Sequence, residues 1–179
     1  MSILLTVLVV IISIVVLILL MALFVKKEYS ILREVTVNKS KQEVFTYIKY
    51  LKNQDNYSVW AMMDPAMKKE FKGVDGTPGF VSAWESENKK VGKGEQEIRS
   101  IVEGERIDLH LHFIKPFEGR ADAYMITEAK SDRQTTVSWG LNSKMAYPMN
   151  IMLLFMNMEK LIGKDLETGL HNLKTLMEK

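Results

Sequence analysis

The 179-residue sequence contains no cysteine and only three histidines. Without cysteine the chain can form no disulfide, no thiolate zinc site and no cysteine nucleophile, although the redox compartment stays open. The three histidines are so placed that no Ser-His-Asp arrangement can be recovered. A charge excess is also missing, since 24 basic residues face 22 acidic residues and the net charge is +2. Nucleic-acid-binding proteins normally carry a basic field, so the composition argues against a nucleic-acid partner.

Charge is absent altogether from an N-terminal segment, residues 3–25. These 23 residues are dominated by Ile, Leu and Val. A helix of this length spans about 34 Å, slightly more than a bilayer core of roughly 30 Å. A secretory signal is the alternative, but it would have a basic start, a shorter apolar core and a small-residue cleavage site. We therefore expect a retained, single-pass transmembrane helix that anchors the chain in the cell membrane.

Two lysines, Lys26 and Lys27, follow the apolar run directly and account for the net positive charge. By the positive-inside tendency they place the rest of the chain on the cytoplasmic side. We assign residues 26–30 to a short linker and residues 31–179 to one ligand-binding domain. With so short a linker, the domain must lie close to the bilayer surface.

The soluble part alternates apolar and polar residues over long stretches. A strand is predicted over residues 29–38, followed by helices over 41–53 and around 57–67. The turn-rich segment "GVDGTPG" (residues 73–79) leads into five alternating segments separated by short turns. With the first strand and the segment near residues 68–73 they make about seven strands, antiparallel because the connections are short.

The chain closes with "MNIMLLFMNMEKLIGKDLETGLHNLK" (residues 149–174). This segment predicts one long helix that begins after Pro148, apolar almost all round at first and amphipathic afterwards. Gly163 and Gly169 each cost up to about 1 kcal/mol of helix propensity, so we expect the helix and sheet backbones to approach closely there. A sheet curved around this helix would bury both apolar faces, which makes the fold class α+β. Bilayer contact by the apolar first turns is a lesser alternative.

Several motifs follow one another over about residues 30–179: "REVTVNKSKQEVFTYI", "FKGVDGTPG", "VGKGEQEI", "TTVSWGLNSKMAYPMN" and "FMNMEKLIGKDLETGLHNLK". In this order they resemble the START-like (SRPBCC, helix-grip) superfamily, in its polyketide-cyclase/dehydrase-like branch. The resemblance implies a curved antiparallel sheet of about seven strands around a long C-terminal helix. It also implies a cavity between them that often takes hydrophobic or lipid-like ligands. It does not imply one reaction, and nothing in the sequence requires a cofactor.

Strand parity and the helix pattern predict which side chains face this cavity. The twelve methionines adapt to irregular shapes and favour a ligand-accepting cavity, with a filled core as the alternative. From the strands and short helices we predict as ligand-binding Trp60, Trp84, Leu109, Leu111, Phe113, Ala123, Met125, Val137, Trp139 and Leu141. From the long helix we predict a roof of Met149, Met152, Leu153 and Met156.

No catalytic constellation emerges from the sequence. His110 and His112 have a spacing that could hold zinc, but solvent-facing positions are the preferred interpretation. The carboxylates of the strands mostly fall opposite the apolar face, away from any buried acid–base site. The first hypothesis is therefore an anchored domain that binds a hydrophobic small molecule or lipid. The alternatives are a cyclase- or dehydratase-type enzyme and a regulatory interaction module, and a protein partner stays open.

Overall fold

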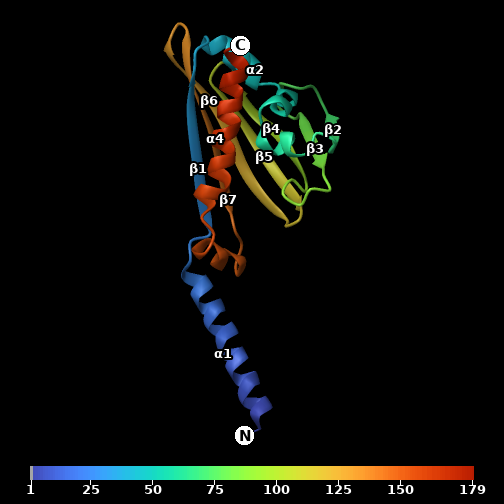
Figure 1. The fold of residues 1–179 in the computed structure, drawn as a ribbon, viewed down its shortest axis with the longest axis vertical. Helices are drawn as coiled ribbons and strands as arrows, with labels where there is room; N and C mark the ends of the chain where they lie inside the picture. Colours follow the sequence, from blue (N-terminus) through green and yellow to red (C-terminus); the bar gives the residue numbers. More distant parts are fainter. Residues whose placement is uncertain (1) are drawn as a thin grey trace.

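A computed structural model describes residues 2–179 and has the predicted α+β architecture (Figure 1). An apolar helix leads into a domain of seven strands, three further helices and two 3₁₀ helices. In chain order the elements are α1 (Ile3–Phe24), β1 (Glu28–Val37), α2 (Lys41–Ile48), η1 (Leu51–Asn56), α3 (Val59–Met63), β2 (Lys68–Lys72), β3 (Val81–Glu85), β4 (Lys93–Val102), β5 (Arg106–Lys115), β6 (Gly119–Ser131), β7 (Gln134–Lys144), η2 (Met149–Leu154) and α4 (Met158–Met177).

The seven strands form one antiparallel sheet in the order β1-β7-β6-β5-β4-β3-β2. The sheet curves around α4, which runs along its inner face next to β1 and β7 (Figure 1). Helix α2 is started by a capping box in which Ser40 and Glu43 satisfy each other's backbone N–H groups. It packs against β6 and β7 at the end of the sheet away from α1, which we call the far end. The predicted sheet around a C-terminal helix is confirmed.

Strand register shows which loops lie near α1. Glu28, four residues after α1, pairs with Lys144 at the end of β7. That end of β7 lies beside the start of β6, where Gly119 pairs with Phe113 of β5. The loop between β5 and β6 is therefore at the same end of the sheet as α1, which we call the anchor end. Figure 1 shows this loop at the lower edge of the sheet, towards α1.

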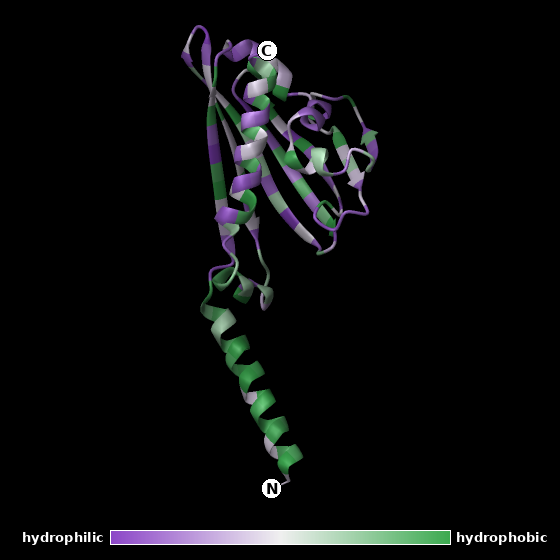
Figure 2. Cartoon of the chain, viewed as in Figure 1, coloured by the Kyte–Doolittle hydropathy of each residue, from purple (hydrophilic) through white to green (hydrophobic). Residues whose placement is uncertain are grey.

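Helix α1 is apolar along its whole length (Figure 2). By length and composition it could cross a membrane, a test that a signal sequence would also pass. Ser2 caps its N-terminus, accepting a hydrogen bond from the Leu5 backbone N–H. Only Val25, Lys26 and Lys27 separate α1 from β1, so the strand begins within the segment that was expected to be linker.

The predicted single helix over residues 149–174 is wrong in its first part. Met149–Leu154 form the 3₁₀ helix η2, and α4 begins only at Met158. The reason is local: the side chain of Asn157 accepts a hydrogen bond from the Lys160 backbone N–H at 2.9 Å and so starts a new helix. The all-round apolar residues before Asn157 thus do not belong to the helix that covers the sheet.

Close packing at the two glycines is present, but side chains rather than sheet backbone make it. A Cβ atom on Gly163 would collide with the guanidinium of Arg33. That guanidinium is held by Glu159, whose carboxylate lies 2.6 Å from Arg33 Nη1. On Gly169 a Cβ atom would lie 3.0 Å from the ring of Trp139. The glycines let α4 lie directly on two long side chains of β1 and β7.

The trough between sheet and α4 is filled at the far end. Side chains from α2, the sheet and α4 meet there without exposure to solvent. This packed half contains Val37, Phe45, Ile107, Val137 and Leu173, each fully buried. The two sequence alternatives, a filled core and a cavity, are therefore both realised, in different halves of the same trough.

Candidate functional site

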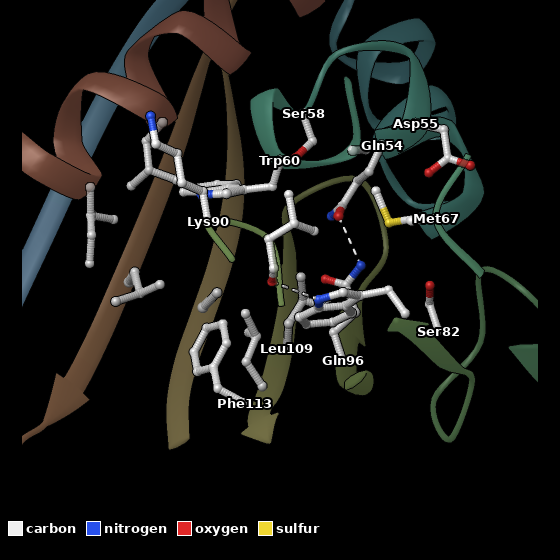
Figure 3. Close-up of a pocket in the computed structure, with 18 of the residues that line it drawn as sticks. Gln54, Asp55, Ser58, Trp60, Met67, Ser82, Lys90, Gln96, Leu109 and Phe113 are labelled. Carbon is white, nitrogen blue, oxygen red and sulfur yellow. Dashed lines mark hydrogen bonds between the residues drawn. The ribbon is translucent and has the colours of Figure 1, made fainter. Parts of the chain in front are cut away.

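A cavity of about 300 Å³ occupies the other half of the trough, towards the anchor end (Figure 3). Its floor is the inner face of β5, β6 and β7, where side chains two residues apart point to the same side. Burial alternates most clearly along β6, whereas five consecutive residues of β7 are buried. Helix α3 and strand β3 close one side, and the first half of α4 covers the top. Its apolar wall includes Trp60, Trp84, Leu109, Leu111, Phe113, Ala123, Trp139, Leu141, Ile162 and Leu166.

Eight of the predicted ligand-binding residues line this cavity: Trp60, Trp84, the three on β5, Ala123, Trp139 and Leu141. Met125 and Val137 have the predicted parity but are buried in the packed half, behind the cavity wall. The roof is different from the prediction. The helix α4 begins only after Asn157. The residues before it do not line the cavity: Met149, Met152, Leu153 and Met156. Ile162 and Leu166 form the roof, and their spacing of four residues after an Asn cap was a usable signal.

Pairs of aromatic rings form two sides of the cavity wall. Trp139 packs edge-to-face against Trp60 and Tyr57, with ring centroids 6.3 and 5.8 Å apart. On the opposite side Trp84 packs edge-to-face on Phe113 at 6.2 Å, and its indole N–H donates to the Val91 carbonyl at 3.2 Å. Such pairs add about 0.5–1.5 kcal/mol beyond their buried area, which favours one arrangement of the rings on each side of the cavity.

One polar pair faces the cavity among these apolar groups. Gln96 donates from Nε2 to Oε1 of Gln54 at 2.9 Å (Figure 3). Gln54 is only 6% exposed, and its own Nε2 has no protein partner in the part of the chain that the structure describes. A buried donor without a partner costs about 1–3 kcal/mol. A hydrogen-bond acceptor brought into the cavity would remove that cost. The sequence analysis missed both glutamines because polar residues in a strand or short helix are by default assigned to solvent.

The titratable side chains on the cavity wall all retain contact with solvent: Asp55, Lys69, Lys90 and Lys115. The carboxylate of Asp55 lies 2.7 Å from the ammonium of Lys69, which neutralises one of the three lysines. Lys90 lies close enough to α4 to act on Asp165. Partial burial raises the pKa of that carboxyl, and the positive charges of Lys164 and Lys90 oppose the rise. The exposed side chains at the rim of the cavity thus carry a net positive charge, and the interior of the cavity carries none.

His110 and His112 face the other side of the sheet. Nδ1 of His110 lies 2.8 Å from the carboxylate of Asp122, and His112 lies within 4 Å of Glu95 and Glu118. Among residues 2–179 no group of three or more His, Asp or Glu side chains is arranged to hold a metal ion. The two histidines form cross-strand polar contacts outside the cavity.

The wall of the cavity extends to the anchor end. There it includes the β5–β6 loop, with Pro116 and the 78% exposed side chain of Phe117. Register places this loop, with its exposed side chains, at the end of the sheet nearest α1.

No protein-family model and no curated protein sequence matches this chain. Solved structures do match it. Norcoclaurine synthase from Thalictrum flavum superposes with a TM-score of 0.59 at 10% identity, covering 87% of this chain and 97% of that one. The chain has the helix-grip fold. A second helix-grip neighbour is the protein TTHA0849 from Thermus thermophilus, with a TM-score of 0.60 at 17% identity, covering 83% of this chain and 97% of that one.

A third helix-grip neighbour is BexL, a di-domain ARO/CYC protein from the BE-7585A biosynthetic pathway. It matches with a TM-score of 0.60 at 12% identity, covering 85% of this chain and 50% of that one. The expected helix-grip architecture, which these neighbours share, is therefore confirmed. At these identities the likeness concerns the fold, and function has to be argued from the cavity itself.

Proposed function

We propose that this protein is a membrane-anchored helix-grip domain that binds a small hydrophobic molecule in the cavity under α4. The observation that carries the proposal is the asymmetry of the trough. One half is packed, whereas the other half is an apolar hollow framed by aromatic rings, and its wall reaches the anchor end. Ligand sites are typically apolar clefts of this kind with a few polar groups that fix orientation.

The size and chemistry of the cavity narrow the ligand class. A volume of about 300 Å³ is at the lower limit of the range common for ligand sites, which suits a small molecule or one end of a longer chain. The unpartnered Nε2 of Gln54 favours a ligand with a hydrogen-bond acceptor, such as a carbonyl. The same fold in norcoclaurine synthase has been crystallised with dopamine and hydroxybenzaldehyde, small aromatic molecules.

The anchor places the binding site close to molecules dissolved in the bilayer. Helix α1 spans the bilayer in this proposal, and Lys26 and Lys27 keep the domain on the cytoplasmic side. The β5–β6 loop of the cavity wall lies at the same end of the domain as α1. A molecule dissolved in the adjacent leaflet would have a short path to the cavity. A cyclase-type reaction would need a titratable group sheltered from water, and the titratable groups on this wall all contact solvent, so binding ranks first.

The test is extraction of bound molecules from the full-length protein. The chain is purified in mild detergent, and the released small molecules are identified by mass spectrometry. Ala123 faces the cavity and Ala83 the outer side of β3, so Ala123→Leu and Ala83→Leu add the same side chain inside and outside the site. We expect a molecule that is retained by the Ala83→Leu protein and lost from the Ala123→Leu protein. Equal amounts in both variants, or none in the wild type, would overturn the proposal.

A further inference from the structure

Large apolar side chains surround the junction between α1 and the domain. Outside α1 they come from the segment between β7 and α4, where Phe155 is 83% exposed. We call this group the collar: Tyr147, Met149, Met152, Leu154 and Phe155, all exposed. A cluster of exposed apolar side chains on one part of a surface marks a contact site rather than ordinary protein surface. The segment is apolar and lies directly against the end of α1 (Figure 2).

The collar is fixed to α1 by a buried polar contact. Asn150 of η2 has no solvent exposure, and its Nδ2 donates to the carbonyls of Ala22 at 2.7 Å and Val25 at 3.0 Å. The last carbonyls of a helix have no partner within the helix, so this side chain satisfies two groups that would otherwise need water. A second tie joins the Met145 N–H to the Lys27 carbonyl at 2.7 Å. The collar therefore stays beside the last turn of α1.

The position of that turn defines the depth of the collar. The 22 residues of α1 span about 33 Å, so when the helix crosses a bilayer core of about 30 Å its last turn lies at the boundary with the headgroups. Phe24, which is 89% exposed, is in this turn. Residues held beside Ala22 and Val25 reach the same depth, where the rings of Tyr and Phe and the chains of Met and Leu are favourable.

We propose that the collar is a second membrane contact, inserted into the acyl–headgroup boundary of the leaflet in which α1 ends. The inference rests on the proposed anchoring by α1. Because the collar is continuous with the lipid-facing surface of α1, lipid is the partner that it contacts. The two contacts together restrict rotation of the domain about the end of α1, so that the β5–β6 loop of the cavity wall stays next to the leaflet.

Absence of cysteine makes the test direct, because any single cysteine can carry a spin label. The full-length chain is reconstituted in nanodiscs of phosphatidylcholine and phosphatidylglycerol, and the accessibility of each label to oxygen and to a nickel chelate is measured. Phe155→Cys and Met149→Cys report on the collar. Ile12→Cys in the middle of α1 is the lipid reference, and Val102→Cys at the far end of the sheet is the water reference.

We expect the oxygen-to-nickel accessibility ratio of both collar labels to shift from the Val102 value towards the Ile12 value. Collar labels that match Val102 while Ile12 is in lipid would overturn the collar and leave the anchor standing. An Ile12 label in water would overturn both proposals. Collar labels shielded from both reagents would show a protein contact and would likewise overturn the lipid assignment.

Discussion

A Cβ atom placed on Gly169 would lie 3.0 Å from the ring of Trp139 and 3.4 Å from the carbonyl oxygen of Tyr57. Trp139 is the cavity-wall residue of β7 nearest the far end, since Val137, two residues further in that direction, belongs to the packed half. The contact between helix α4 and this ring thus divides the hollow part of the trough from the filled part. A side chain at residue 169 would press on that partition.

Gly169→Met is expected to destabilise the domain. Extra atoms in a tightly packed position cost about 1–3 kcal/mol, and the gain in helix propensity over glycine offsets at most about 1 kcal/mol. Thermal unfolding followed by tryptophan fluorescence measures the change, with Trp139 as a reporter at the site. Glu167→Met, on the exposed side of α4, is the matched control and should leave the midpoint almost unchanged. Equal midpoints for the two variants would contradict the close contact.

Replacing a buried polar residue usually lowers stability, but the unpartnered amide of Gln54 leads us to expect the opposite. Gln54→Leu alone leaves Gln96 without its acceptor, whereas Gln54→Leu combined with Gln96→Leu removes both polar groups. Replacing both partners with apolar groups is nearly neutral or stabilising. We therefore expect the double variant to unfold at or above the wild-type temperature and above the single variant. A double variant that is the least stable of the three would show that the pair supports the fold rather than the ligand.

Asn150→Ala is expected to loosen the domain relative to α1. Each lost hydrogen bond to Ala22 and Val25 removes about 0.5–1.5 kcal/mol from the junction. Spin labels on Leu20→Cys in α1 and Glu118→Cys in the β5–β6 loop report the distance across it. The distance distribution should be narrow in the parent and broad in the Asn150→Ala protein. Asn56→Ala, at an exposed position of the domain, is the control. A distribution in the Asn150→Ala protein as narrow as in the parent would contradict the role assigned to Asn150.

The C-terminal end of α4 is tied to β1 by a carboxylate whose effect depends on pH. Oε1 of Glu178 accepts hydrogen bonds from the ammonium of Lys174 at 2.6 Å and from the Asn38 backbone N–H at 2.7 Å. The bond from Lys174, and next the Asn38 N–H, lower the pKa of this carboxyl below its ordinary value of 4.5. Because the pKa of Glu178 is lower in the folded state, its carboxylate stabilises the fold above pH 4.5. This stabilisation is lost as the pH falls through the lowered pKa.

Glu178→Gln should therefore reduce the unfolding temperature at pH 7, and the difference from wild type should shrink as the carboxyl becomes protonated. Unfolding temperatures measured between pH 3 and pH 7 give the curve. Glu167→Gln, an exposed carboxyl on the same helix, provides the reference for a general charge effect. A difference from wild type that is constant across this pH range would contradict the role assigned to the carboxylate.

The periodic features of this protein can be read from its sequence alone. Alternation along β5 and β7 identified the side chains of Leu109, Leu111, Trp139 and Leu141 as inward-facing, because residues two apart in a strand share a face. The uncharged run at the N-terminus fixed the length of α1, and the motif order indicated a helix-grip fold. These properties depend on neighbours a few residues away, so local sequence contains them.

Which half of the trough is empty depends on how distant elements pack together. Val137 and Leu141 have the same parity, yet one is enclosed by α2 and α4 and the other faces the cavity, because α2 reaches only the far end of the sheet. The bond between Gln54 and Gln96 and the tie from Asn150 to Ala22 join residues 42 and 128 positions apart. Such contacts depend on how distant elements fill a shared space, and the period of a single strand or helix does not encode that.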